Sequence, residues 1–146
     1  MTGAPLVLDA AGLESLSTAR PPERFRALLA EAHRRGREVL APTLVCAEVA
    51  RGRARTPALE AAVGRHHRNS AERPAVRLVD TTFDLARQVG AILEAAKAGS
   101  ERIVDAHVVA VCVSYGGGLV VTSDPSDIAE LADGAPATRV RTTGPS

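Results

Sequence analysis

The sequence predicts an α/β fold in which a central parallel sheet of about five strands is flanked by helices. Short apolar runs typical of buried strands alternate with longer segments of helical periodicity, an order that favours parallel strands joined by helical crossovers. Only 2% of the residues are aromatic although 45% are hydrophobic, so the core must consist of tightly packed aliphatic side chains. A length of 146 residues fits one domain. We expect this single domain to span residues 1–146, with the last few residues forming a flexible tail.

Five segments have the pattern of strands. Each is a short run of aliphatic or β-branched residues bounded by turn-forming or charged residues. The strand candidates are residues 5–9, 38–42, 76–80, 119–122 and, as an edge strand, 137–142.

Helical patterns fill the segments between these strands. The segment 102–115 is almost continuously apolar, but it is too long for an ordinary strand and is expected to be a buried helix. Thr43 and Thr82 are expected at helix starts, and Gly36 and Gly99 at helix ends. The expected helices are residues 10–16, 21–36, 43–52, 56–68, 81–98, 102–115 and one that begins at Pro125.

The positive charge is concentrated in one part of the chain. The net charge is only +1, but residues 20–77 hold 13 Arg against six Glu, and the remainder is acidic. Five of these arginines are candidates for contact with phosphate groups, although a solvated arginine-rich surface is the alternative. With one Tyr and two Phe, the chain offers few rings on which bases could stack. These candidate phosphate-binding residues are Arg51, Arg53, Arg55, Arg65 and Arg68.

Nothing in the sequence predicts insertion into a membrane or secretion. The longest apolar run is shorter than the roughly 18 residues that a membrane span requires, and the first residues do not resemble a signal peptide. Cys46 and Cys112 lie in apolar surroundings without the spacing of metal ligands, so we expect buried, reduced thiols. The expected location is the cytoplasm.

Five acidic residues in apolar surroundings are candidates for a functional site. They are Asp9, Glu48, Asp105, Asp124 and Asp127. Asp9 and Asp124 follow strands, and ligands of open parallel sheets bind at the carboxyl ends of the strands. Two carboxylates about 4 Å apart repel by roughly 4 kcal/mol at an effective dielectric constant of about 20, so converging acids require protonation, basic partners or a divalent cation.

Each acid also has a structural alternative. Asp9 and Asp124 are typical N-cap residues, and Asp124 precedes a proline suited to the first position of a helix. Asp105, near a helix start, complements the helix dipole, and Glu48 in mid-helix is compatible with an ion pair to a nearby arginine. Convergence is favoured because the alternative requires several independent explanations.

A site made only of carboxylate oxygens suits a hard cation such as Mg²⁺ or Mn²⁺ and argues against zinc. Such a cation lowers the pKa of a bound water and positions it for attack on a phosphodiester. The expected catalytic residues are Asp9, Glu48, Asp105 and Asp124. The expected metal ligands are Asp9 and Asp105 directly, Asp124 directly or through water, and Asp127 through water or a second ion.

Four motifs, in order along the chain, carry a resemblance to a known family. They are Leu-Val-Leu-Asp9-Ala, Pro-Thr-Leu-Val-Cys-Ala-Glu48-Val-Ala-Arg-Gly, Ile-Val-Asp105-Ala-His-Val-Val-Ala and Val-Val-Thr-Ser-Asp124-Pro-Ser-Asp127-Ile. Together they resemble the PIN domain, and most closely the VapC ribonuclease toxins of prokaryotic toxin–antitoxin pairs. The resemblance covers essentially the whole chain. It implies a five-stranded parallel sheet, Mg²⁺ or Mn²⁺ in the acidic cluster, RNA cleavage that leaves a 5′-phosphate and a 3′-hydroxyl, homodimerisation and neutralisation by a cognate antitoxin.

One position departs from the family pattern. Many relatives carry a hydroxyl residue two places after the first aspartate, where this chain has Ala11, so we expect Thr122 and Ser123 to supply the hydroxyls that orient the metal ligands. The departure favours the alternative of a catalytically weak PIN-like module that binds RNA or a partner. A response-regulator receiver fits less well, because it would need an acidic pair after the first strand and a lysine after the last core strand. The chain has a lone Asp9, and its only lysine is Lys97, within a predicted helix.

Overall fold

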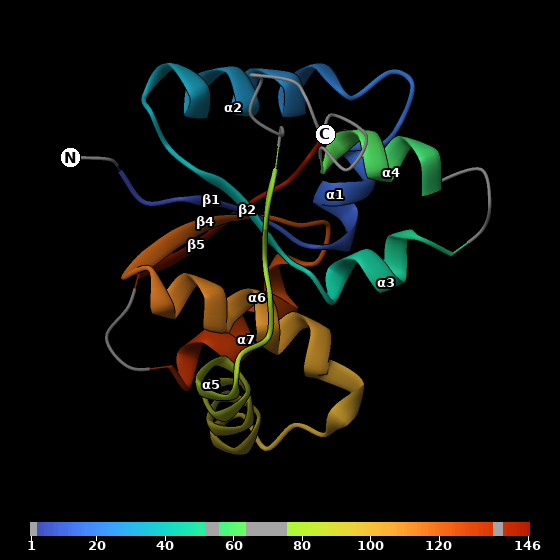
Figure 1. The fold of residues 1–146 in the computed structure, drawn as a ribbon. Coiled ribbons are helices and arrows are strands. Elements are labelled where there is room, and N and C mark those ends of the chain that lie inside the picture. The colour runs from blue at the N-terminus through green and yellow to red at the C-terminus, as the bar shows by residue number, and fades with distance from the viewer. Residues whose placement is uncertain (1–2, 52–55, 64–75, 136–138) are drawn as a thin grey trace.

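The computed structural model describes residues 3–51, 56–63, 76–135 and 139–146. Five strands form one sheet in the order β3-β2-β1-β4-β5, and all neighbouring strands are parallel (Figure 1). The strands are β1 (Leu6–Leu8), β2 (Val39–Pro42), β3 (Arg77–Val79), β4 (Gly117–Val121) and β5 (Arg139–Thr143). The predicted α/β fold with about five parallel strands is therefore confirmed, although residues 137–138 of the last candidate lie outside the described residues.

Helices cover both faces of the sheet. On one face lie α1 (Ala10–Leu16), α2 (Glu23–Arg34) and α4 (Thr56–Ala62), and on the other lie α5 (Phe83–Ala95), α6 (Ile103–Ser114) and α7 (Pro125–Asp133) (Figure 1). The short helix α3 (Val45–Val49) follows β2, and the 3₁₀ turn η1 (Ser100–Arg102) leads into α6. No helix in the described part of the chain combines the length and apolar character needed to cross a membrane.

Several helix ends differ from the prediction for local reasons. Thr82 caps α5 as expected, since its hydroxyl accepts a hydrogen bond from the Leu85 N–H at 3.1 Å. Thr43 does not cap α3, because its hydroxyl donates to the Asp80 carboxylate at 2.5 Å and the helix begins two residues later. The helix α5 ends at Ala95, before the expected Gly99, because Lys97 adopts a left-handed φ of 53°. The expected helix beyond residue 63 lies outside the described residues.

The strand order reverses between β1 and β4. From β1 the chain adds β2 and β3 on one side and then places β4 and β5 on the other. This order differs from the 2-1-3-4-5 order of receiver domains, which removes that alternative. In open parallel sheets, ligands bind outside the carboxyl ends of the strands at the reversal. Leu8 pairs with Val121 there, so Asp9 and Thr122 leave the sheet next to each other.

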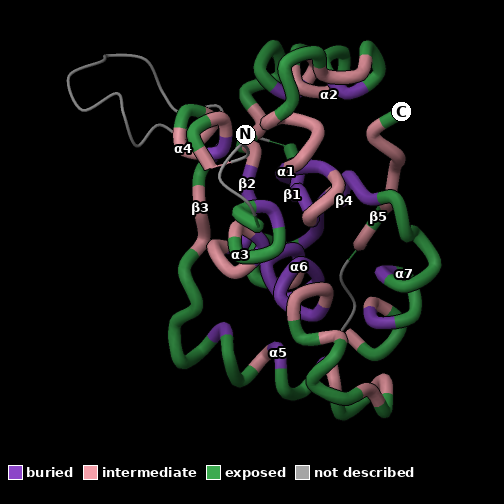
Figure 2. The backbone as a smooth tube through the Cα atoms, turned by 90° about the vertical axis from the view of Figure 1, so that its right-hand side faces the viewer, coloured by how far each residue is buried: buried purple, intermediate pink, exposed green. Residues whose placement is uncertain are grey.

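The helix α6 forms the centre of the core. Its residues from Ala106 to Cys112 are all buried, and Figure 2 shows the buried backbone concentrated in α6, β1 and β4. The helix packs closely on β4 at Gly118, where an added Cβ would lie 2.8 Å from the Cys112 Sγ. Because α6 leads into the start of β4, its own first turn lies at the carboxyl edge of the sheet. That turn carries Asp105.

The two cysteines differ in burial. Cys112 is buried as expected, whereas Cys46 is only partly buried, and neither forms a disulfide. Cys46 lies on α3, which is too short to be enclosed on all sides by the core. The expectation that both thiols are buried therefore holds only for Cys112.

Candidate functional site

Asp9 is the most deeply buried of the candidate acids. It follows β1 directly, caps α1 and is only 7% exposed. Its Oδ1 accepts a hydrogen bond from the Gly12 N–H at 3.1 Å, and the Thr122 hydroxyl donates a second hydrogen bond to the carboxylate. Burial raises the pKa of Asp9 above its ordinary value of 3.8, these hydrogen bonds oppose the rise, and the charge of Asp124 adds to it. Asp9 is thus both a helix cap and a carboxylate whose charge a cation would stabilise.

Asp105 is half-buried in the first turn of α6. Burial is the largest cause of its raised pKa, followed by the negative charges of Asp9 and Asp127, and Asp124 adds a smaller contribution. The positive charge of Arg102 acts in the opposite direction. Three aspartates, one after β1 and two at the start of α7, therefore lie close enough to Asp105 to act on it, although they are far apart in the sequence.

Asp124 and Asp127 are exposed at the start of α7. Asp124 occupies the N-cap position and Pro125 follows it, but the Asp124 side chain makes no capping hydrogen bond. The sequence allowed the Asp124 carboxylate to be explained as a helix cap, but the side chain does not have that role. Asp127 lies in the first turn of α7, where its charge complements the helix dipole.

The hydroxyl of Thr122 connects two of the acids. Thr122 is 1% exposed, and its own N–H donates to the Thr143 carbonyl oxygen at 2.9 Å, which fixes the residue to the end of β5. Its Oγ1 accepts a hydrogen bond from the Asp124 N–H at 2.9 Å while its hydroxyl hydrogen is donated to Asp9. Ser123, the other expected hydroxyl, is exposed.

Glu48 is more exposed than Asp9 and Asp105. It lies on the surface of the short helix α3, and it is not among the charges that raise the pKa of Asp9 or Asp105. The residues around Glu48 are apolar in the sequence, but α3 buries only Val45 and Val49. Arg51 is exposed just after this helix. The other four candidate phosphate-binding arginines lie outside the part of the chain that the structure describes: Arg53, Arg55, Arg65 and Arg68.

The donor set fits a hard cation held partly by water. Across the described ranges, no three His, Cys, Asp or Glu side chains form a group that could hold a metal ion. Mg²⁺ often binds through only one or two carboxylates and keeps several waters until substrate phosphates join it. Asp9 and Asp105 fit this mode, because both carry carboxylates whose charge is penalised by burial and by neighbouring acids. His107 is buried, its Nδ1 lies 2.7 Å from the Ile103 carbonyl oxygen, and its Nε2 has no hydrogen-bond partner within the described residues.

Arg102 is a residue that the sequence did not indicate. It ends η1 three residues before Asp105, and its side chain is 19% exposed. Its Nη2 donates to the main-chain carbonyl oxygen of Asp127 at 2.8 Å, and its Nη1 lies 3.4 Å from the Glu130 Oε1. No local sequence signal marks these contacts, because Asp127 lies 25 residues later in the chain.

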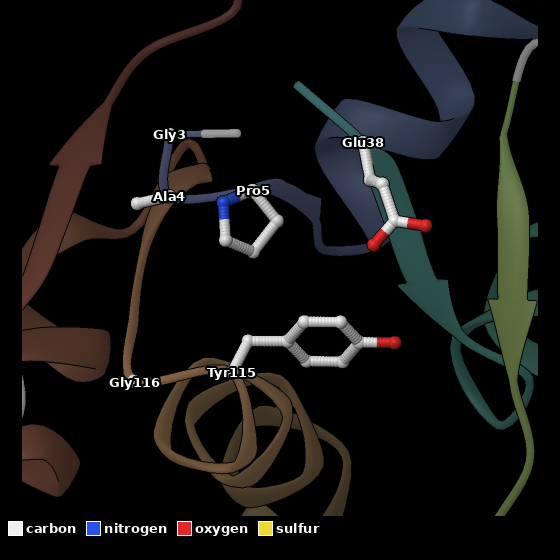
Figure 3. Close-up of a pocket in the computed structure, with 6 residues that line it drawn as sticks. All are labelled: Gly3, Ala4, Pro5, Glu38, Tyr115 and Gly116. Carbon is white, nitrogen blue, oxygen red and sulfur yellow. The ribbon is translucent and has the colours of Figure 1, made fainter. Parts of the chain in front are cut away.

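A pocket at the opposite end of the sheet is separate from the acids. It is lined by Gly3, Ala4, Pro5, Glu38, Tyr115 and Gly116 (Figure 3). Its polar side chains are already engaged, since Arg77 lies 3.1 Å from the Glu38 carboxylate and donates a hydrogen bond to the Tyr115 hydroxyl. The pocket lies where β1, β2 and β4 begin and is not part of the acidic site.

Comparison with known proteins agrees with the fold. A model of the PIN domain family matches residues 14–134, a span that contains every candidate acid except Asp9. No curated protein gives a significant match.

Three solved structures share the fold. A structure of FitAB bound to an IR36 DNA fragment matches with a TM-score of 0.62 and 20% identity over 96% of this chain and 94% of the other. DNA-bound VapBC from Salmonella typhimurium matches with a TM-score of 0.62 and 16% identity over 96% and 98% of the chains. FitAcB from Neisseria gonorrhoeae matches with a TM-score of 0.61 and 18% identity over 96% and 97%. At these identities the likeness concerns the fold alone.

Proposed function

Since the chain belongs to the PIN domain family, we propose that it is a divalent-metal-dependent endoribonuclease of the VapC toxin type. The observation that carries the proposal is that Asp9, Asp124 and Asp127 all lie close enough to Asp105 to act on it, at the carboxyl edge of the sheet beside the strand reversal. Burial and neighbouring acids raise the pKa of Asp9 and of Asp105, and a cation bound between these carboxylates would stabilise their charged forms. A phosphodiester is the substrate class that such an ion serves.

In this proposal Asp9 and Asp105 bind Mg²⁺ or Mn²⁺ directly, because burial and neighbouring acids raise the pKa of both carboxyl groups and a cation would stabilise their charged forms. Asp124 and Asp127 reach the ion or its waters from the exposed start of α7. The ion, when bound, supplies an acidified water and neutralises charge on phosphate oxygens. Thr122 orients the Asp9 carboxylate, and Glu48 contributes only through water or a second ion that arrives with RNA.

The proposed substrate and partners follow from charge and from the likeness of fold. The arginines at positions 51, 53, 55, 65 and 68 contact the RNA backbone and supply affinity that depends on salt. The solved structures of similar fold are named as FitAB and VapBC complexes, and two of them contain DNA. By analogy we propose that this chain forms a homodimer, pairs with a cognate antitoxin and acts on RNA in the cytoplasm.

Cleavage of structured RNAs in Mg²⁺ or Mn²⁺ tests this proposal. The wild-type protein should cleave these RNAs, and cleavage should stop when excess chelator removes the metal ion. Asp105→Asn should lose more than the roughly 10- to 100-fold that is typical of residues outside the coordination shell. Asp84→Asn is the matched control, because it removes an equal charge from an exposed acid on α5. Cleavage that persists in Asp105→Asn or in chelator would exclude the metal-carboxylate mechanism.

A PIN-like module that binds RNA or a partner without efficient cleavage is the second candidate. Two observations favour it: Ala11 takes the place of a hydroxyl residue, and the described residues contain no group of three close ligating side chains. Fluorescence anisotropy with labelled RNA separates the two functions. The binding module predicts RNA affinity without turnover in Mn²⁺, and affinity that is unchanged or higher in Asp105→Asn because a negative charge is removed.

A further inference from the structure

Arg102 links the two helices that carry the aspartates on one face of the sheet. Asp105 lies in the first turn of α6, Asp127 lies in the first turn of α7, and these helices pack against each other. Arg102 is at the N-cap position of α6. Both of its recorded side-chain contacts, to the Asp127 carbonyl oxygen and to Glu130, are with α7.

The hydrogen bond to Asp127 is the stronger part of this link. Glu130 is 64% exposed, so its ion pair with Arg102 is screened by water and contributes little. The Arg102 side chain is 19% exposed, and its Nη2 donates a well-formed hydrogen bond of 2.8 Å to the main-chain carbonyl oxygen of Asp127. Arginine suits this position because its rigid planar fork loses less entropy on bonding than a lysine ammonium does.

Electrostatics alone would disfavour an arginine at this place. A positive charge near a cation site repels the ion, and Arg102 is close enough to act on Asp105. Direct attraction between Arg102 and the metal ion therefore cannot explain why an arginine lies here. Its hydrogen bond to the first turn of α7 offers an explanation.

We propose that Arg102 is a positioning residue for the metal site: its guanidinium holds the first turn of α7 against the start of α6 and so fixes Asp124 and Asp127 relative to Asp105. The inference rests on the proposed function, because it concerns the same site. Arg102 acts through the main chain of Asp127 and does not touch the ion itself.

The affinity for Mn²⁺ separates the positioning role of Arg102 from its electrostatic effect, because the two predict opposite changes in that affinity when Arg102 is replaced. Arg102→Met keeps the length and apolar stem of the side chain but removes its charge and donors. The positioning role predicts that Mn²⁺ binding weakens about tenfold, as expected for the loss of a residue that orients ligands. Charge removal alone predicts tighter binding. The dissociation constant is measured from the electron paramagnetic resonance signal of free Mn²⁺ and checked by isothermal titration calorimetry.

Three further variants make the comparison specific. Arg102→Lys keeps the charge and a donor, and should bind Mn²⁺ with an affinity between those of the wild type and Arg102→Met. Glu130→Gln removes the exposed ion pair but leaves the bond to Asp127, and should change the affinity less than about twofold. Arg87→Met removes an exposed arginine that pairs with Asp84 on α5, and should leave the affinity unchanged. Melting temperatures identify any variant that does not fold. If Arg102→Met does not fold, the comparison of Arg102→Lys with the wild type tests the inference instead.

The outcomes distinguish this inference from the proposed function. Equal or tighter Mn²⁺ binding by folded Arg102→Met overturns the positioning role and leaves the metal site intact. A wild type that binds no Mn²⁺ overturns both. In RNA cleavage, positioning predicts that Arg102→Met needs more Mn²⁺ but reaches the wild-type rate at saturation. A lower maximal rate with an unchanged Mn²⁺ requirement contradicts it.

Discussion

Replacing Asp9 by Asn separates the two roles of this side chain. Asn is about as good an N-cap as Asp, so it keeps a hydrogen-bond acceptor for the Gly12 N–H but carries no charge. Asp9→Ala removes the charge and the cap together. The difference between Asp9→Asn and the wild type therefore reports the charge, and the difference between the two variants reports the cap.

The sign of the charge effect follows from the raised pKa of Asp9. The folded protein binds the Asp9 proton more tightly than the unfolded chain does, so this carboxyl stabilises the fold below its ordinary pKa of 3.8. The contribution is lost as the pH rises from that value through the folded pKa. Asn does not titrate, so without metal at pH 7 Asp9→Asn should melt at or above the wild-type temperature. The advantage should shrink toward pH 3.5.

The size of the cap effect follows from one hydrogen bond at a helix start. Loss of an N-cap acceptor costs about 1 kcal/mol, within a range of roughly 0.5–2 kcal/mol. For a domain of this size, a change of about 1 kcal/mol in the free energy of unfolding shifts the melting temperature by roughly 3 °C. Asp9→Ala should therefore melt about 3 °C below Asp9→Asn.

Thermal denaturation followed by circular dichroism, in EDTA and then in Mn²⁺, checks these values. At a Mn²⁺ concentration of 100 times Kd, the wild type should gain about 2.7 kcal/mol, and Asp9→Asn should gain much less because it lacks a direct ligand. If Asp9→Asn melts well below the wild type in EDTA at pH 7, the charge of Asp9 is stabilising and the electrostatic reasoning is wrong. Equal melting of Asp9→Asn and Asp9→Ala would show that the cap contributes nothing.

Three other predictions concern single side chains. Thr122→Val leaves the Asp124 N–H without its acceptor and should lower the free energy of unfolding by about 1–2 kcal/mol in urea titrations. Thr122→Ser keeps the hydroxyl and should retain most of the wild-type stability. An unchanged urea midpoint for Thr122→Val would contradict the bridging role of Thr122. Gly118→Ala should destabilise by about 1–3 kcal/mol, because the new Cβ would lie 2.8 Å from the Cys112 Sγ, and a neutral result in the same titration would mean that α6 can move away from β4. Burial raises the pKa of the Cys112 thiol to about 12, so this thiol should react slowly with alkylating reagents. Mass spectrometry should find it unmodified after iodoacetamide treatment of the folded protein at pH 8. Rapid alkylation would show that the thiol is accessible.

The sheet was predictable because each strand has a local signal. The runs at residues 5–9 and 119–122 are apolar on both sides, as buried parallel strands must be, and each is followed by an acid and a helical pattern. The carboxyl-end rule then places Asp9 and Asp124 at one edge. Asp105 was predictable for a related reason, because a helix that returns to the start of the next strand begins at the edge where the strands end.

Other features of the site depend on contacts that no local pattern encodes. Glu48 lies among apolar residues, but a helix of five residues buries only Val45 and Val49, and Glu48 remains exposed at the edge of that face. Thr43 has the residue type of a cap, yet a carboxylate 37 residues later, that of Asp80, takes its hydroxyl instead. Arg102 looks like an ordinary charged residue before a helix until α7 is placed beside it.

The most direct measurement is the anomalous scattering of Mn²⁺ in crystals of the wild type grown or soaked with the ion. The central claim predicts a Mn²⁺ peak within coordination distance of the Asp9 and Asp105 carboxylates, with waters or Asp124 and Asp127 completing the shell. The same peak should disappear in Asp105→Asn. Mn²⁺ bound elsewhere, or no peak at concentrations that support RNA cleavage, would contradict the claim that these acids form the metal site.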